Sequence, residues 1–337
     1  MKRWQFWLGM AISAVLLWDA LRGFQLAEAW EIIRSAHYWW LIPGVAIYFL
    51  AVVARAWRWH YLLRPIKSIS TKAMFPVVAI GYMGNNIYPA RAGELLRAYI
   101  LRHREDVAIS ASLATILVER GLDGVVMLAF VFINLPELAT LTADSGFAGS
   151  IQTLAIIGTV VFFSAVLVFI LMAVFPKRAM QLIEWFTARL LPERFRSQVN
   201  DLSERFLEGF AALRSPLDVF MVLITSIVIW LLETGKYWFV MHAFPFQVSF
   251  FALMLMNGIV NLATTIPSAP GYVGTFDRPG IAVLEAYGVK KSLATSYTLV
   301  LHAALWLPIT LLGAYYMTRE GLTWERVKSE IEREEEA

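Results

Sequence analysis

Residues 84–94 read GNNIYPARAGE, and residues 261–274 read NLATTIPSAPGYVG. Both stretches place amide, charged, proline or glycine residues between long apolar runs. Non-helical backbone at bilayer depth is tolerated only where protein or a water-filled cavity satisfies its hydrogen bonds. The two stretches therefore predict two breaks in membrane-embedded helices, and they mark a site rather than a lipid-facing wall.

The composition around the breaks is that of a helical membrane protein. Hydrophobic residues make up 58% of the chain, and the mean hydropathy is +0.60. Several apolar runs are long enough to cross a hydrocarbon core about 30 Å thick. The absence of Cys excludes disulfides, thiolate metal sites and cysteine nucleophiles. The net charge of +3 fits contact with anionic lipid surfaces and argues against a nucleic-acid partner.

Hydropathy windows predict six full transmembrane helices. The spans are 4–22, 39–62, 109–133, 151–175, 217–241 and 293–317. Tryptophans near the ends of these runs are interpreted as anchors in the headgroup layer: Trp4, Trp7, Trp18, Trp39, Trp40, Trp57 and Trp59. The predicted fold class is an all-α polytopic integral membrane protein, with residues 1–317 as a single transmembrane domain.

Loop charges set the predicted orientation. Loops 134–150 and 242–250 contain no Lys or Arg, whereas 63–72 and 176–216 contain several. The positive-inside rule therefore places the second pair of loops and both termini in the cytoplasm, including the charged tail 318–337. We expect a bacterial or archaeal cytoplasmic (inner) membrane.

The first break predicts a re-entrant helical hairpin. Residues 73–108 must begin and end on the cytoplasmic side to keep this orientation. The two arms, 73–87 and 91–101, are each too short to cross the bilayer at about 1.5 Å per residue. The segment is therefore expected to enter the membrane and return.

The second break predicts a hairpin from the opposite face, entering over 248–266 and returning over 281–289. A full span over the first arm is the alternative, because it would place the two lysines after residue 289 inside. With two hairpins, the halves 1–140 and 150–317 have opposite orientations. This is the arrangement of an inverted-topology repeat, in which broken helices meet near the midplane.

The first break contains a cluster of charged residues. Arg91, Glu94 and Arg97 follow a three-residue spacing, so they project from one side of a short helix, with Glu94 between two guanidiniums. The functional interpretation is a clamp for an anionic headgroup, to which Asn86 adds a polar group. The structural alternative is an interfacial helix with ordinary salt bridges and snorkelling arginines.

The span 109–133 contains Glu119, Arg120 and Asp123 near the expected bilayer centre. Charges at that depth are costly unless paired or hydrated, so they should face the protein interior. Arg120 and Asp123 can pair, while Glu119 is left to meet another helix through Arg91 or Arg97. These three residues could form a second part of the anion site or supply a carboxylate that takes up a proton during transport. The structural alternative is that they hold helices together.

The second break supplies hydrogen-bonding groups and bent backbone. Its candidate binding residues are Asn261, Thr265, Pro270, Gly271, Gly274 and Asp277, with Arg278 as a candidate ion-pair partner for Asp277. Glu233 and Lys236 are interpreted as an ion pair in the span 217–241, and His302 as a hydrogen-bonding residue of the core.

Enzyme signatures are missing from the chain. We find no GxSxG elbow, HExxH, Walker A motif, DDxxD pair or metal-spaced His/Asp/Glu cluster. We therefore predict a non-enzymatic protein without a cofactor.

Three ordered motifs carry a family resemblance. They are Asn86-x-x-Pro89-x-Arg91-x-Gly93-Glu94-x-x-Arg97, Glu119-Arg120-x-x-Asp123, and Pro267-x-x-Pro270-Gly271-x-x-Gly274 followed by a span with His302 and Pro308. Over residues 10–317 the chain resembles the membrane domain of the lysylphosphatidylglycerol synthase/flippase family. The resemblance implies a lipid flippase-like transporter, in stand-alone form without the soluble aminoacyltransferase domain that follows in large bacterial members.

The first functional hypothesis is therefore a translocator for an anionic phospholipid or a polyprenyl-phosphate-linked glycan. The phosphate would be bound by Arg91, Arg97 and Arg120. These arginines would be positioned by Glu94, Glu119 and Asp123, which could also take up a proton. The rest of the headgroup would be bound by Asn86, Asn261 and Thr265.

Two other functional hypotheses stay open. Residues 176–214 mix charged and apolar positions, which predicts one or two helices along the inner interface, with cytosolic packing as the alternative. These helices could dock a glycosyltransferase or lipid-modifying enzyme, which would make the chain an accessory subunit. An ion-coupled small-molecule transporter is the third hypothesis. The apolar residues expected on the outer surface could equally contact lipid or form a subunit interface in a homo-oligomer.

Overall fold

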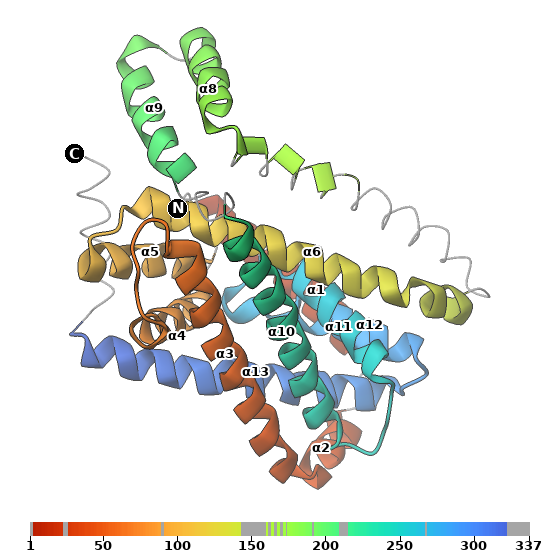
Figure 1. The fold of residues 1–337 in the computed structure, drawn as a ribbon. Helices are drawn as coiled ribbons and strands as arrows, with labels where there is room; N and C mark the ends of the chain where they lie inside the picture. Colours follow the sequence, from red (N-terminus) through yellow and green to blue (C-terminus); the bar gives the residue numbers. More distant parts are fainter. Residues whose placement is uncertain are drawn as a thin grey trace.

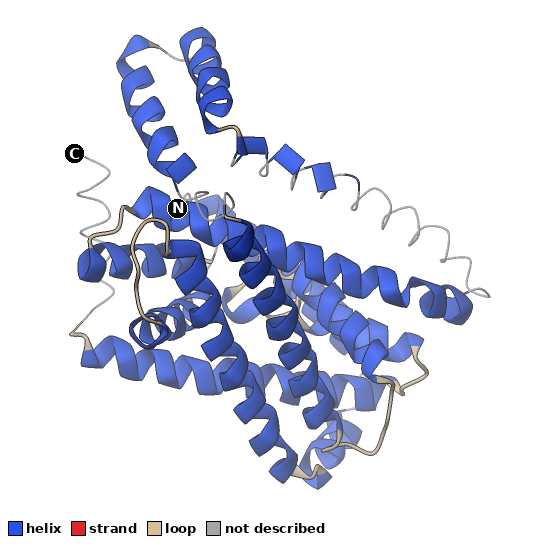
Figure 2. Cartoon of the chain, viewed as in Figure 1, coloured by secondary structure: helices blue, strands red, loops and turns tan. Residues whose placement is uncertain are grey.

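The computed structural model describes residues 3–22, 26–88, 91–142, 174–190, 192–208, 215–266 and 268–321, with a few shorter pieces between 160 and 172. Its helices are α1 (Arg3–Leu21), α2 (Leu26–Ser35), η1 (Tyr38–Trp40), α3 (Leu41–Leu63), α4 (Thr71–Ile87), α5 (Ala92–Glu105), α6 (Ile109–Thr142), α8 (Pro176–Leu190), α9 (Glu193–Glu208), α10 (Pro216–Met241), α11 (Phe250–Ala263), η4 (Pro270–Tyr272), α12 (Asp277–Ala286) and α13 (Lys291–Arg319). No strand occurs in these ranges (Figure 2). The predicted all-α membrane fold is confirmed.

Three segments are long and apolar enough to cross a membrane. They are Tyr38–Leu63, Leu217–Met241 and Lys291–Arg319, and each coincides with a predicted span. Helices α1 and α6 begin close to two further predicted spans, whereas 151–175 lies largely outside the described residues. Helix α6 continues to Thr142, so the loop predicted from residue 134 was placed too early.

Serine caps define the start of three helices. Ser70, Ser215 and Ser249 precede α4, α10 and α11, and each side chain accepts a hydrogen bond from the backbone N–H three residues on. Such a cap satisfies one of the N–H groups that a helix leaves unpaired at its first turn. Local sequence therefore sets where both the first and the second broken segments begin.

The first broken segment is a pair of tightly crossed helices. Helices α4 and α5 pack against each other on either side of the break, and Pro89 and Ala90 lie outside the described residues. A Cβ atom on Gly93 would lie 1.9 Å from the carbonyl oxygen of Gly81, and one on Gly84 would lie 2.7 Å from Gly93 Cα. Small residues permit this close backbone contact, as they do between membrane helices generally.

The second broken segment also consists of helix, break and helix. Helix α11 leads into the short η4 turn, and α12 then packs back against α11. Helix α12 begins at Asp277, so the returning arm predicted from residue 281 was placed too late. Pro267 lies outside the described residues. The membrane faces from which the two segments enter, and the inverted repeat, stay predictions.

The remaining helices surround these two segments. Besides α4 with α5, the most extensive pairings are α3 with α10, α4 with α13 and α6 with α11 (Figure 1). One hydrophobic cluster is formed mainly by α3, α4 and α5, a second by α10, α11, α12 and α13. Since α3 belongs to the first half of the chain and α10 to the second, the two halves interlock.

Helices α8 and α9 extend from one end of the bundle (Figure 1). They pack against each other, and α9 contacts α6. Leu182, Trp185 and Phe186 of α8 are exposed. One or two helices were expected in residues 176–214, and the structure has two there, while their position along the membrane interface stays a prediction.

One of the predicted tryptophan anchors was wrong. Trp59 is fully buried, and its indole donates to Thr115 Oγ1 at 3.0 Å. Trp7, Trp18 and Trp39 are exposed, as expected of headgroup-layer residues. Trp59 was misread because its position near the end of an apolar run does not reveal which side of the helix it occupies.

Candidate functional site

The two breaks meet against α13. Asn86 Nδ2 donates to Thr310 Oγ1 at 2.8 Å, and Trp306 Nε1 donates to the Asn86 carbonyl at 3.2 Å. Gly271 reaches the same place with a φ of 72°, and a Cβ atom there would lie 2.9 Å from Trp306 Nε1. Only glycine combines that backbone conformation with so close an approach at low cost. The two breaks thus lie side by side and share contacts with the same turn of α13.

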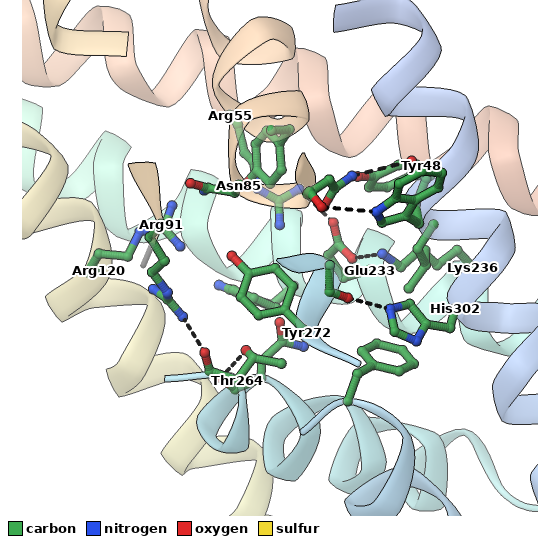
Figure 3. A pocket seen from close by; sticks show the side chains of 18 residues that line it. Tyr48, Arg55, Asn85, Arg91, Arg120, Glu233, Lys236, Thr264, Tyr272 and His302 are labelled. Atoms are coloured by element: carbon green, nitrogen blue, oxygen red, sulfur yellow. Dashed lines mark hydrogen bonds and ion pairs between the residues drawn. The ribbon is translucent and has the colours of Figure 1, made fainter. Parts of the chain in front are cut away.

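A cavity of about 120 Å³ lies where the breaks meet (Figure 3). Its lining combines cations, amides, hydroxyls and aromatic rings: Tyr48, Arg55, Tyr82, Asn85, Asn86, Arg91, Arg120, Trp230, Glu233, Lys236, Asn261, Thr264, Gly271, Tyr272, Phe276, His302, Leu305 and Trp306. Among the predicted binding residues, Asn86, Arg91, Arg120, Asn261 and Gly271 line it. Arg91 and Arg120 lie on one side of Tyr272, and Glu233 and Lys236 on the other (Figure 3).

The first wall is built on the N-terminus of α5. Arg91 caps this helix with a φ of 56°, which is uncommon for a residue other than Gly, and its Nη2 donates to the Thr264 carbonyl at 3.3 Å. Glu94 Oε1 lies 3.7 Å from Arg91 Nη1 and 3.4 Å from Arg120 Nε. The predicted position of Glu94 between Arg91 and Arg97 was wrong, because Arg120 of α6 takes the place expected for Arg97.

Arg97 points into a buried network behind this wall. Its Nη1 lies 2.9 Å from Glu119 Oε2, and its guanidinium lies 4.0 Å from the centre of the Trp59 ring. Arg58 of α3 donates to both oxygens of Asp123 at 2.5 and 3.2 Å and lies 3.5 Å from Glu119. Arg97, Glu119 and Asp123 are therefore brought together beside the cavity without lining it.

Two of the sequence-based pairings around α6 are confirmed. Arg120 Nη1 lies 3.6 Å from Asp123 Oδ2, as the i,i+3 spacing predicts. Of the two partners considered for Glu119, Arg97 is the one that it meets.

The second wall comes from α3 and α10. Arg55 Nη1 donates to Glu233 Oε1 at 2.6 Å, and Lys236 contacts the other carboxylate oxygen of Glu233. Lys236 Nζ also lies 4.2 Å from the centre of the Tyr48 ring. The predicted Glu233–Lys236 pair is confirmed, and all three charged groups are buried. Two cations here share one carboxylate.

His302 fixes the second break from α13. Its Nδ1 lies 2.8 Å from Asp277 Oδ1, and its Nε2 lies 2.7 Å from the Gly271 carbonyl. Asp277 Oδ2 accepts the Gly274 N–H at 2.8 Å. The expected Asp277–Arg278 pair was wrong, because Arg278 turns outward to Asp19 and Glu285. Neighbouring residues on a helix point about 100° apart, which separates the two side chains.

The other predicted residues of the second break lie outside the cavity. Thr265 is exposed, and its hydroxyl donates to the Leu262 carbonyl at 2.6 Å. Gly274 faces α1, where a Cβ atom would lie 2.8 Å from the Ser13 carbonyl oxygen. Pro270 borders a second, apolar hollow.

This second hollow is an open apolar groove of about 590 Å³. It is lined by Asn86, Ile87, Pro270, Gly271, Val273, Leu299, His302, Ala303 and Trp306. Asn86, Gly271, His302 and Trp306 also line the polar cavity. We call these four residues the shared wall, because a charged compartment and an apolar one lie on its two sides. Within the described ranges, no group of His, Asp or Glu could hold a metal ion.

Comparison with known sequences places this architecture in a family. The sequence model of the "Lysylphosphatidylglycerol synthase TM region" matches residues 6–313. The chain belongs to this family. The match extends over all the residues that line the cavity and the groove.

Similar proteins in this family come from archaea. "Glycosyltransferase AglD" of Haloferax volcanii is 26% identical over an alignment of 314 residues that covers 85% of this chain and 50% of that protein. A "UPF0104 membrane protein" of Methanothermobacter thermautotrophicus is 24% identical, covering 81% of this chain and 83% of its own length. "UPF0104 membrane protein PH1989" of Pyrococcus horikoshii is 23% identical, covering 91% and 93%. The chain thus spans half of the first of these relatives. No solved structure matches it.

Sequence reasoning about this member of the lysylphosphatidylglycerol synthase transmembrane family missed the two arginines of α3. Arg55 lines the cavity and Arg58 holds Asp123. A signal was present, because two arginines three residues apart within an apolar span face the protein interior by default. The aromatic lining residues Tyr48, Tyr82 and Tyr272 gave no such signal, since aromatic residues are common in membrane spans.

Proposed function

We propose that the chain translocates lipids with a phosphate-containing anionic headgroup across a cytoplasmic membrane, with both of its termini on the cytoplasmic side. The observation that supports this is the shared wall, on which a cationic polar cavity adjoins an open apolar groove. An amphiphile needs both environments at once: hydrogen-bond donors for its headgroup and apolar surface for its chain. Shielding the headgroup lowers the cost of moving its charge through hydrocarbon.

Arg91 and Arg120 bind the phosphate in this proposal. Both line the cavity and both are partly accessible, with 27% and 26% of their side chains exposed. Arginine forks match phosphate oxygens in a bidentate manner. Asn86 and Asn261 contact the remaining polar groups of the headgroup. Arg97, Glu119 and Asp123 position the wall from behind, and the protein performs no covalent chemistry.

The test is lipid movement in proteoliposomes. Purified protein is reconstituted with a fluorescent anionic phospholipid, and dithionite quenching measures transfer between leaflets. Arg91→Ala should reduce transfer at least about tenfold, because each charge-assisted hydrogen bond contributes on the order of 1.5–3 kcal/mol. Arg102→Ala is the matched control, since Arg102 is an exposed α5 arginine paired with Asp106. Protein-independent transfer, or equal transfer by both variants, would remove the basis of this proposal.

An accessory subunit is the second candidate. The half-length match to a protein named as a glycosyltransferase favours it, as do the exposed apolar residues of α8. In that case the purified chain alone would move no lipid. Trp185→Ala with Phe186→Ala would then impair a co-expressed partner's lipid-linked product more than Arg91→Ala does.

A further inference from the structure

The charged groups around the cavity are unequal in number. Six basic side chains, Arg55, Arg58, Arg91, Arg97, Arg120 and Lys236, are connected through ion pairs to four acidic ones, Glu94, Glu119, Asp123 and Glu233. The further acid, Asp277, has partners of its own. Its two oxygens contact His302 Nδ1 and the Gly274 N–H, so it does not pair with the cations of the cavity walls.

The excess positive charge lies on the cavity walls. Behind the first wall, Arg58 and Arg97 are matched by Glu119 and Asp123 at short distances. On the first wall, Arg91 and Arg120 lie 3.7 and 3.4 Å from the single carboxylate of Glu94. Arg120 also lies 3.6 Å from Asp123, but Arg58 already pairs with that carboxylate at 2.5 Å.

The second wall repeats this arrangement with Arg55, Lys236 and Glu233. Each wall therefore contributes one uncompensated positive charge. Arg120 Nε on the first wall lies 3.4 Å from Glu94 Oε1 but makes no hydrogen bond among the described residues. Arg55 Nε on the second wall is likewise buried without a hydrogen bond there, as are Arg58 Nε and Arg97 Nε behind the first wall.

A buried excess charge is costly, and a ligand of opposite charge between the walls removes that cost. Two unit charges call for a dianion. The size of the cavity narrows the choice further, since about 120 Å³ is well below the roughly 300–1,000 Å³ of pockets that enclose a whole drug-sized ligand. The space suits a single compact group rather than a sugar.

We propose that the ligand is a phosphate monoester with two negative charges, whose hydrocarbon chain lies in the apolar groove beyond the shared wall. This inference rests on the proposed function. A phosphate monoester carries about −1.5 to −2 charges at neutral pH, whereas a phosphodiester such as phosphatidylglycerol carries one. The site thereby selects against most bilayer phospholipids by charge as well as by headgroup size.

Two lipids that differ by one methyl group test this inference. Dioleoyl phosphatidic acid is a monoester, and dioleoyl phosphatidylmethanol is its monoanionic methyl ester. Binding of each to the purified chain in phosphatidylcholine nanodiscs is measured at about pH 8, where the monoester is a dianion. Phosphatidic acid should bind roughly tenfold tighter or more. Inorganic phosphate, which has the charge without the chain, should bind far more weakly than phosphatidic acid.

Substitutions show which residues produce the preference for phosphatidic acid over phosphatidylmethanol. Arg91→Gln and Arg120→Gln should each weaken phosphatidic acid binding and bring the two lipids to similar affinities. Arg102→Gln should preserve the preference, because Arg102 lies on the outer surface of α5.

The outcomes separate the two proposals. Equal binding of both lipids by the unmodified protein would overturn the dianion inference and leave the translocator standing. Tight binding of inorganic phosphate would assign the site to free phosphate, against both proposals. Binding of neither lipid would also overturn both.

Discussion

Arg97 of α5 and Glu119 of α6 form an ion pair of 2.9 Å, with 5% and 1% of their side chains exposed. The Arg97 guanidinium also lies over Trp59 of α3, so this one side chain joins three helices. Arg91 and Arg120, by contrast, border the cavity. The arginines of one charged region thus divide into a buried group that joins helices and a partly accessible group that lines the cavity.

Arg97→Gln should therefore affect mainly the stability of the protein, and Arg120→Gln mainly its lipid transfer. Arg97→Gln leaves Glu119 buried with only the 3.5 Å contact to Arg58, and should cost about 3–5 kcal/mol of unfolding free energy. Arg120→Gln should change stability by about 1 kcal/mol or less and abolish most lipid transfer, because Asp123 keeps Arg58. Unfolding in mixed micelles and the liposome assay measure the two effects. Equal loss of stability in both variants would contradict the division.

Arg58→Met should destabilise the chain by about 3–5 kcal/mol, because it removes the main partner of the buried Asp123 and the second partner of the buried Glu119, which keeps Arg97. Adding Asp123→Leu should recover part of this loss, since an apolar replacement of a buried pair is often neutral. A double-mutant cycle of unfolding free energies measures the coupling. Additive effects would show that the Arg58–Asp123 contact contributes little.

Gly93→Ala should be strongly destabilising, because its methyl group would overlap the Gly81 carbonyl in the crossing of α4 and α5. Overpacking of this kind costs about 1–3 kcal/mol or more. Gly121→Ala on α6 is the control: a Cβ atom there meets nothing within 4 Å, and alanine should stabilise the helix by up to about 1 kcal/mol. Melting temperatures of the two variants should shift in opposite directions, and a tolerated Gly93→Ala would argue against the crossing.

His302→Phe should loosen the second break, because the Gly271 carbonyl and Asp277 each lose a hydrogen-bond partner. We expect faster hydrogen–deuterium exchange in the peptide covering residues 268–276, by mass spectrometry. His103→Phe, on the C-terminal turn of α5, should leave that peptide unchanged. Unchanged exchange in His302→Phe would mean that the break is held by other contacts.

The breaks and spans could be predicted because their signals are local. Pro, Gly and Asn interrupt apolar runs at fixed places, and the serine caps precede the helices that they start. Pairs of charged residues within one helix, such as Arg120–Asp123 and Glu233–Lys236, could also be predicted, but most partners on other helices could not. Glu94 meets Arg120 rather than Arg97, and Asp123 meets Arg58, which is 65 positions away in the chain. Such pairs depend on how helices pack, and many packings satisfy the same helical spacing.

The shared wall of Asn86, Gly271, His302 and Trp306 has a consequence for how this protein can diversify. Each of the four residues borders the charged compartment on one side and the apolar one on the other. A substitution that adapts the wall to a different polar group also reshapes the surface that the chain would contact. Under the proposed function, preferences for the two ends of an amphiphile would be inherited together, and relatives that move other lipids should differ at several of these four positions at once.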